Sequence, residues 1–177
     1  MANCVIWITG LPGSGKSTIA EGLKDIVKDI VILRVDEIRK FITPKPTYSE
    51  DEREIVYRAL VFTALKLFQK GHTVIIDATA NMRRWRDLAR QCIDRFLEVY
   101  VRCPLEVCIS RERSRADTFG APVHIYEKAK EGWPVPGVNV PYEEPINPDL
   151  IIDTHLTSPD VAIGLITDRL MTFQTLK

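Results

Sequence analysis

The sequence predicts an α/β fold in which a five-stranded parallel sheet is covered on both faces by helices. Short apolar runs recur along the chain, and each is followed by a loop or by a segment of helical periodicity. Their continuous apolar character is typical of strands that are buried on both faces. The runs are Cys4–Thr9, Ile30–Leu33, Thr73–Ile76, Leu97–Val101 and Leu150–Ile152.

The segment after the first strand is rich in glycine and reads Gly10-Leu-Pro-Gly-Ser-Gly-Lys-Ser17. It matches the pattern G-x-x-x-x-G-K-[ST] between a strand and a helix, which predicts a phosphate-binding loop and the P-loop NTPase fold. Glycines allow the turn that points successive backbone N–H groups into one concavity, and the next helix adds its positive end. We therefore expect a nucleoside triphosphate. The alternative, a glycine-rich turn without a ligand, is disfavoured by the flanking strand and helix.

The loop pattern also assigns roles to individual residues. Lys16 is expected to be catalytic and to reach the β- and γ-phosphates, and the Ser17 hydroxyl is expected to hold Mg²⁺. The other nucleotide contacts are expected from Gly10, Leu11, Pro12, Gly13, Ser14, Gly15 and Thr18.

Acidic residues stand at the ends of the next two strands, where ligands bind in open parallel sheets. Asp36 follows the second strand, and we expect it to position or deprotonate an acceptor hydroxyl during phosphoryl transfer. Asp77 ends the third strand and is expected to hold Mg²⁺ or its water shell. The structural alternatives are the N-cap of a helix over Glu37–Phe41 for Asp36 and a turn or cap for Asp77.

Two further helices are marked by their capping residues. Ser49 can cap a long helix whose first turn is acidic and which Gly71 ends. A last helix is expected to start at Ser158-Pro159-Asp160, with proline in the first helical position, and to pack on the sheet.

Residues 114–148 depart from this regular order, because they contain six prolines and only one short helical stretch, around Ile125–Lys130. A segment of this length with so little regular structure is typical of a functional lid. We call residues 114–148 the lid segment.

Basic residues near these positions can neutralise phosphate charge, because the guanidinium fork matches phosphate oxygens. The candidates are Arg39, Arg53, Arg111, Arg113, Arg115, Lys128 and Lys130. For any one arginine alone, a solvated surface ion pair is the simpler explanation. A denser cluster is not expected to be a nucleic-acid site, because the chain has no net positive charge; it consists of Arg83, Arg84, Arg86 and Arg90.

Length and composition narrow the class of protein. The 177 residues fit one domain, residues 1–177, that needs no disulfide or structural metal. With 24 basic and 24 acidic residues, no net charge recruits nucleic acid or a membrane. No apolar run approaches the ~18 residues that span a bilayer, so we expect a cytoplasmic protein. The four cysteines and three histidines lack metal-site spacing, and we expect packed, reduced thiols.

A GTPase switch is the main alternative from another class, because switches use the same loop. Common GTPases also need an Asn/Thr-Lys-x-Asp segment for guanine, and the sequence contains none. A non-catalytic nucleotide-binding module would leave the acidic strand ends and the lid segment unexplained. We therefore expect a kinase.

The chain resembles the adenylylsulfate kinase family over nearly its whole length. Thr9–Thr18 resembles the family's loop, and Asp36-Glu-Ile-Arg39 resembles its Asp-Asn-Ile-Arg element. Tyr48-Ser49 followed by Arg53 resembles its Phe-Ser…Asp-Arg stretch. Three further stretches resemble the family's base-binding and lid segments: Pro104–Cys108 with Arg111, Ile125–Lys130, and Pro141-Tyr-Glu-Glu-Pro145.

The resemblance implies an ATP- and Mg²⁺-dependent kinase. Its acceptor would be the 3′-hydroxyl of adenosine 5′-phosphosulfate, and its products 3′-phosphoadenosine 5′-phosphosulfate and ADP. The resemblance adds Arg111 to the nucleotide-binding residues and implies a homodimer. It implies as substrate-binding residues Asp36, Arg39, Arg53 and Lys128.

The sequence departs from the family at several of these positions. Arg34 stands where the family has the first Asp of Asp-Gly-Asp, and Val56 stands where an Asn often contacts substrate. Trp133-Pro-Val-Pro-Gly137 replaces a Phe-Thr-Gly-Ile-Asp segment that stacks on adenine, so Trp133 either supplies that aromatic plane or packs.

A further departure concerns the acceptor. Thr79–Met82 replaces an Ile-Ser-Pro-Tyr segment, and Asp77-Ala-Thr with Asn81 is similar to the Asp-Thr-Asn of polynucleotide 5′-kinases. A polynucleotide 5′-hydroxyl kinase, or another small-molecule hydroxyl kinase, is therefore the alternative.

Overall fold

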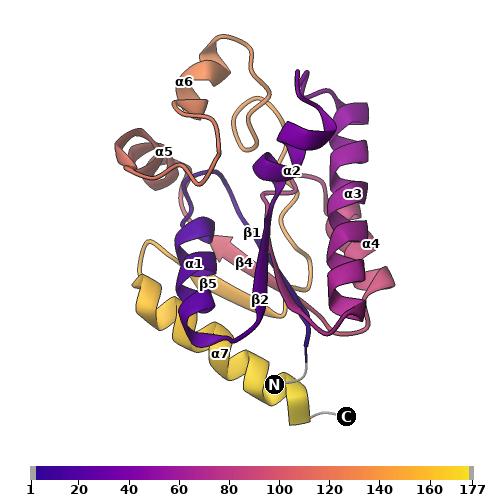
Figure 1. Cartoon of the computed structure of the whole chain (residues 1–177). Coiled ribbons are helices and arrows are strands. Elements are labelled where there is room, and N and C mark those ends of the chain that lie inside the picture. Colours follow the sequence, from indigo (N-terminus) through magenta and orange to yellow (C-terminus); the bar gives the residue numbers. More distant parts are fainter. Residues whose placement is uncertain (1–2, 176–177) are drawn as a thin grey trace.

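A computed structural model describes residues 3–175 (Figure 1). Its five strands form one parallel sheet in the order β2-β3-β1-β4-β5. The predicted fold class is confirmed, and each strand end lies within one residue of its predicted position. The strands are β1 (Val5–Thr9), β2 (Ile30–Arg34), β3 (Thr73–Asp77), β4 (Phe96–Arg102) and β5 (Leu150–Asp153).

Helices cover both faces of the sheet because alternate strand residues point to opposite sides. On one face, Ile6 and Ile8 of β1 pack with α1 and α7. On the other, Val5 and Trp7 pack with α3 and α4. The helices are α1 (Lys16–Ile26), α2 (Val35–Ile42), α3 (Glu50–Gln69), α4 (Arg83–Cys92), α5 (Leu105–Ser114), α6 (Ile125–Lys130) and α7 (Pro159–Thr175).

The predicted helix ends have the expected chemistry at α3 and α7. The Ser49 hydroxyl accepts a 3.3 Å hydrogen bond from the Glu52 N–H, and Gly71, with φ +93°, follows the end of α3. Helix α7 begins at Pro159, as predicted. The capping alternative for Asp36 is wrong, because α2 begins at Val35 and not at Glu37, and its N-cap is Arg34.

The lid segment returns across the carboxyl end of the sheet. Figure 1 shows α5 and α6 on one side of this end and α2 with the upper part of α3 on the other. A small separate core joins the lid segment to the phosphate-binding loop, in which Tyr126 and Val135 pack with Cys108 and Leu11. The loop and the lid segment are therefore built as one packed unit.

Two general properties follow from the described residues. The cysteines at positions 4, 92, 103 and 108 are free thiols. Within residues 3–175, no helix has the length and apolar character that crossing a membrane requires.

Candidate active site

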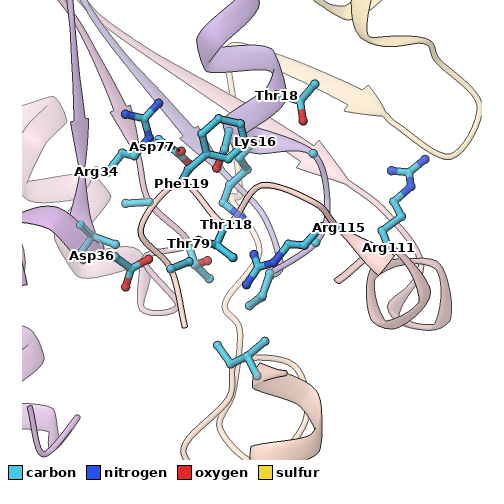
Figure 2. Close-up of a pocket in the computed structure, with 18 of the residues that line it drawn as sticks. Lys16, Thr18, Arg34, Asp36, Asp77, Thr79, Arg111, Arg115, Thr118 and Phe119 are labelled. Atoms are coloured by element: carbon cyan, nitrogen blue, oxygen red, sulfur yellow. Dashed lines mark ion pairs between the residues drawn. The ribbon is translucent and has the colours of Figure 1, made fainter. Parts of the chain in front are cut away.

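A cavity of about 700 Å³ opens at the carboxyl ends of β1, β2 and β3 (Figure 2). Its walls come from the phosphate-binding loop, α2, the lid segment and the loop between β5 and α7. The predicted site residues that line it are Pro12, Gly13, Gly15, Lys16, Ser17, Thr18, Asp36, Arg39, Arg53, Asp77 and Arg111. Those that do not line it are Gly10, Leu11, Ser14 and Lys128.

The backbone of the phosphate-binding loop requires glycine at positions 10, 13 and 15. Gly13 and Gly15 have φ values of +81° and +103°, which side chains disfavour. A Cβ on Gly10 or Gly13 would lie 2.3 Å from a carbonyl oxygen, that of Val101 or Cys108 respectively. The loop runs directly into α1, whose first N–H groups have no carbonyl one turn earlier. This arrangement fits an anion such as a triphosphate.

Lys16 is the buried cation of the loop, with 8% of its surface exposed. Its Nζ donates a 2.8 Å hydrogen bond to the Leu11 carbonyl oxygen. Burial lowers the pKa of Lys16, while the nearby carboxylates of Asp77 and Asp36 oppose that change. A phosphate oxygen at this point would stabilise the charged ammonium further.

Two carboxylates face the same cavity. Asp36 lies in the first turn of α2, and Asp77 ends β3 (Figure 2). Burial raises the pKa of Asp36; the neighbouring charge of Arg39 opposes this effect, and that of Asp77 adds to it. A carboxyl that holds its proton more tightly is the kind of group that can accept one from a hydroxyl.

The oxygen ligands near the loop are few. Ser17 and Asp77 both line the cavity, and residues 3–175 contain no group of three or more His, Cys, Asp or Glu side chains that would hold a metal by themselves. Mg²⁺ is usually held by one or two protein oxygens together with phosphates and water. This donor set therefore fits Mg²⁺ that arrives with a nucleotide.

Arg53 lies at the junction of three chain segments. Its Nε donates to the Tyr48 carbonyl oxygen at 3.0 Å, and its other nitrogens donate to Asn81 Oδ1 at 3.0 Å and the Pro134 carbonyl oxygen at 2.8 Å. Burial lowers the pKa of Arg53. Arg53 therefore holds the wall of the cavity together, in addition to lining it.

Arg39 is buried beside Glu52, with which its guanidinium forms an ion pair. The guanidinium also lies 4.7 Å from the centre of the Tyr48 ring, a cation–π distance. Its Nε has no hydrogen-bond partner within the described part of the chain. Arg39 is therefore held in the cavity wall by Glu52 and Tyr48.

An aromatic pair forms another part of the cavity wall. The half-buried rings of Tyr48 and Trp133 have centroids 5.2 Å apart at an interplanar angle of 44°. Lys128 lies behind this pair, with Nζ 4.9 Å from the centre of the Trp133 ring. Lys128 therefore contacts a residue of the cavity wall but does not line the cavity itself. Val56, by contrast, is fully buried in the core.

Sequence reasoning missed two parts of the cavity wall. Phe119 and its neighbours in the lid segment line it, and the Phe119 ring centre lies 5.4 Å from the Arg34 guanidinium. The loop after β5 also lines it. Its Thr154 hydroxyl donates to the Ser14 carbonyl oxygen at 2.7 Å, and Arg111 donates to the Thr154 carbonyl oxygen at 2.8 Å. The only sequence signal was polar residues after the last strand.

Three arginines on α4 form ion pairs within the protein, and only Arg86 among them is buried. Arg86 is 1% exposed and pairs with Glu98 at 2.7 Å, and Arg90 pairs with Asp149 at 2.9 Å. Arg84 pairs with glutamates on α3.

The run Pro141–Pro145 fastens the lid segment to the sheet. The Tyr142 hydroxyl lies 3.0 Å from the Thr9 hydroxyl, and the Glu143 carboxylate accepts a 2.7 Å hydrogen bond from the Arg83 N–H. Neither Tyr142 nor Glu143 lines the cavity.

Comparisons with known sequences identify one family. A family model described as Adenylylsulphate kinase matches residues 2–153. The chain is 36% identical to a probable adenylyl-sulfate kinase of Archaeoglobus fulgidus, over 85% of this chain and 95% of the relative. It is 38% identical to a probable adenylyl-sulfate kinase of Halalkalibacterium halodurans, over 92% of this chain and 80% of the relative.

A solved structure extends the similarity to three dimensions. It is the Mycobacterium tuberculosis APS kinase in complex with AMPPNP and APS. The TM-score is 0.81 at 28% identity, and the match covers 96% of this chain and 98% of that one.

Proposed function

The chain belongs to the adenylylsulfate kinase family, and from this premise we propose that its cavity transfers the γ-phosphoryl group of ATP to the 3′-hydroxyl of adenosine 5′-phosphosulfate. The chain is an ATP-dependent kinase. One observation supports the proposal most: the phosphate-binding loop, Asp36 and Asp77 line one cavity, whose wall also includes Tyr48 and Trp133.

The phosphates of ATP bind at the loop. Lys16 exchanges its bond to the Leu11 carbonyl for bonds to phosphate oxygens, and the N–H groups at the start of α1 bind the same anion. Ser17 and Asp77 would hold Mg²⁺, which neutralises phosphate charge when it is bound. Arg111, tied to the loop through Thr154, lines the same part of the cavity.

The acceptor binds between α2 and the lid segment. Asp36 accepts a hydrogen bond from the 3′-hydroxyl and directs the oxygen in line with the γ-phosphate, which is its main role because the transition state is loose. Arg39 and Arg53 supply positive charge for the phosphosulfate. The adenine stacks against the aromatic pair of Tyr48 and Trp133, whose rings contact each other.

The test is ADP production from Mg-ATP with adenosine 5′-phosphosulfate, AMP or a 5′-hydroxyl oligonucleotide as acceptor. We expect turnover with the phosphosulfate and a 3′-phosphorylated product. Turnover with the oligonucleotide instead would replace the proposed acceptor. The Lys16→Ala variant serves as the control and should lose about 10²–10³ in kcat, because one phosphate-facing donor is removed.

The homodimer and the cytoplasmic location expected from the sequence stay predictions. Light scattering of the purified protein measures the first, and fractionation of cells that express it measures the second.

A further inference from the structure

Arg34 ends β2 directly beside Asp77, which ends β3. The two residues are register partners on neighbouring parallel strands, so their side chains point to the same face of the sheet. Arg34 Nε lies 3.8 Å from Asp77 Oδ2, and both residues line the cavity (Figure 2). A fixed positive charge therefore stands next to the carboxylate that is proposed to hold Mg²⁺.

The surroundings keep the Arg34 guanidinium in place. It forms ion pairs with Glu21 of α1 and, at 3.5 Å, with Glu37 of α2. The Phe119 ring of the lid segment lies 5.4 Å from the guanidinium. The Arg34 side chain is 13% exposed, and its Nε has no hydrogen-bond partner within residues 3–175. Because the guanidinium is mostly buried, water and salt screen its charge less than they would screen an exposed arginine.

The charges that line the cavity predict how Arg34 affects ligand binding. Asp36 and Asp77 both face the space that the triphosphate enters, and like charges repel. Arg34 offsets the carboxylate of Asp77 before any metal ion arrives. A divalent cation meets the opposite effect, because Arg34 repels it from Asp77.

We propose that Arg34 is a resident counter-ion of Asp77 that lowers the dependence of nucleotide binding on divalent cation. It is a positioning residue, because it acts on the nucleotide through Asp77. This inference rests on the proposed function, in which Asp77 holds Mg²⁺.

The experiment measures the dissociation constant of AMPPNP by calorimetry, once with excess EDTA and once with saturating Mg²⁺. The ratio of the constant in EDTA to the constant in Mg²⁺ reports how strongly the metal aids nucleotide binding. In Arg34→Gln the metal-free constant should rise and the Mg²⁺ constant should stay level or fall. The ratio should increase roughly tenfold. This is well below the roughly 10³-fold effect of a bare unit charge at about 4 Å with an effective dielectric constant of about 20, because Glu21 and Glu37 share the charge of Arg34.

Arg102 offers a matched control at the other side of the sheet. It ends β4 beside its register partner Asp153 of β5, with Nε 2.6 Å from Asp153 Oδ1, and it lies outside the cavity. Arg102→Gln removes the same kind of pair and should leave the ratio unchanged. Arg34→Lys keeps the charge and should stay within about threefold of the parent. It also provides a second variant if Arg34→Gln folds poorly.

Asp77→Asn tests the assignment of Asp77 to Mg²⁺ separately from the inference on Arg34. On its own it should lower the ratio, because the metal loses a ligand. If it does not, the metal assignment of Asp77 is wrong and the inference on Arg34 falls with it. If it does, Arg34→Gln in the Asp77→Asn background should change the ratio by less than about twofold. A tenfold rise there, or no rise in the single Arg34→Gln variant, overturns the inference on Arg34 alone.

Discussion

The hydroxyl of Tyr126, in the lid segment, donates a 2.6 Å hydrogen bond to the carbonyl oxygen of Pro12, in the phosphate-binding loop. These residues are 114 positions apart in the sequence. The bond therefore couples the order of α6 to the shape of the loop that receives the nucleotide.

Tyr126→Phe should destabilise the protein by about 1 kcal/mol, because it leaves the Pro12 carbonyl without its partner. The effect should be local. Amide hydrogen exchange should become faster in α6 and in the phosphate-binding loop, while β1 and β4 stay protected. Equal acceleration throughout the chain would show that the bond does not couple these two segments in particular.

Asp36→Asn should lower kcat by about 10²–10⁴, because it removes the carboxylate that positions the acceptor hydroxyl and can accept its proton. The KM for ATP should stay within about threefold, because the loop that binds the phosphates is unchanged. Steady-state kinetics with adenosine 5′-phosphosulfate measure both. Asp25→Asn, an exposed change on α1, is the control and should retain full activity. A wild-type rate for Asp36→Asn would remove Asp36 from the reaction.

The same substitution predicts a pH dependence of stability. Burial raises the pKa of Asp36, so the folded protein binds this proton more tightly than the unfolded chain. The group therefore reduces stability as the pH rises from its unfolded pKa, about 3.9, through its folded pKa. Asp36→Asn should melt at a higher temperature than the parent at about pH 7. This gain should shrink as the pH falls towards about 4. A gain that grows on acidification would contradict the sign.

Trp133→Ala tests whether the aromatic pair of Tyr48 and Trp133 binds a base. Loss of one stacking plane costs about 1–3 kcal/mol, so the KM for adenosine 5′-phosphosulfate should rise by roughly 5- to 150-fold. The KM for ATP should not change, and Trp133→Phe should restore most of the loss. If the alanine variant lowers only the melting temperature, Trp133 has a packing role.

Arg86→Met should destabilise the fold by about 3–5 kcal/mol, because it leaves the buried Glu98 without its main partner. The double change with Glu98→Leu should cost less than the single one, since no charge is then stranded. Urea denaturation measures both free energies of unfolding. Equal losses in the two variants would mean that packing, and not charge, dominates at this site.

Structural features that depend only on residues close together in the sequence could be predicted from the sequence alone. The strands, the loop Gly10–Ser17 and the Ser49 cap depend on patterns shorter than one helix, so their structure was predictable. The placement of Asp36 and Asp77 in one cavity also followed, because parallel strands bring their carboxyl ends to one edge.

Other residues acquired their roles only from the tertiary structure. Arg53 was predicted as a ligand, but its bonds to Asn81 and Pro134 cross 28 and 81 positions of sequence. Arg86 was part of a basic cluster, and only the packing of α4 on the sheet buries it against Glu98. Arg34 stood out as a departure from a motif, and the strand order β2-β3 placed it beside Asp77. The physical reason is common to all three: local sequence determines backbone conformation, whereas the partner of a charge depends on which distant segments the fold brings together.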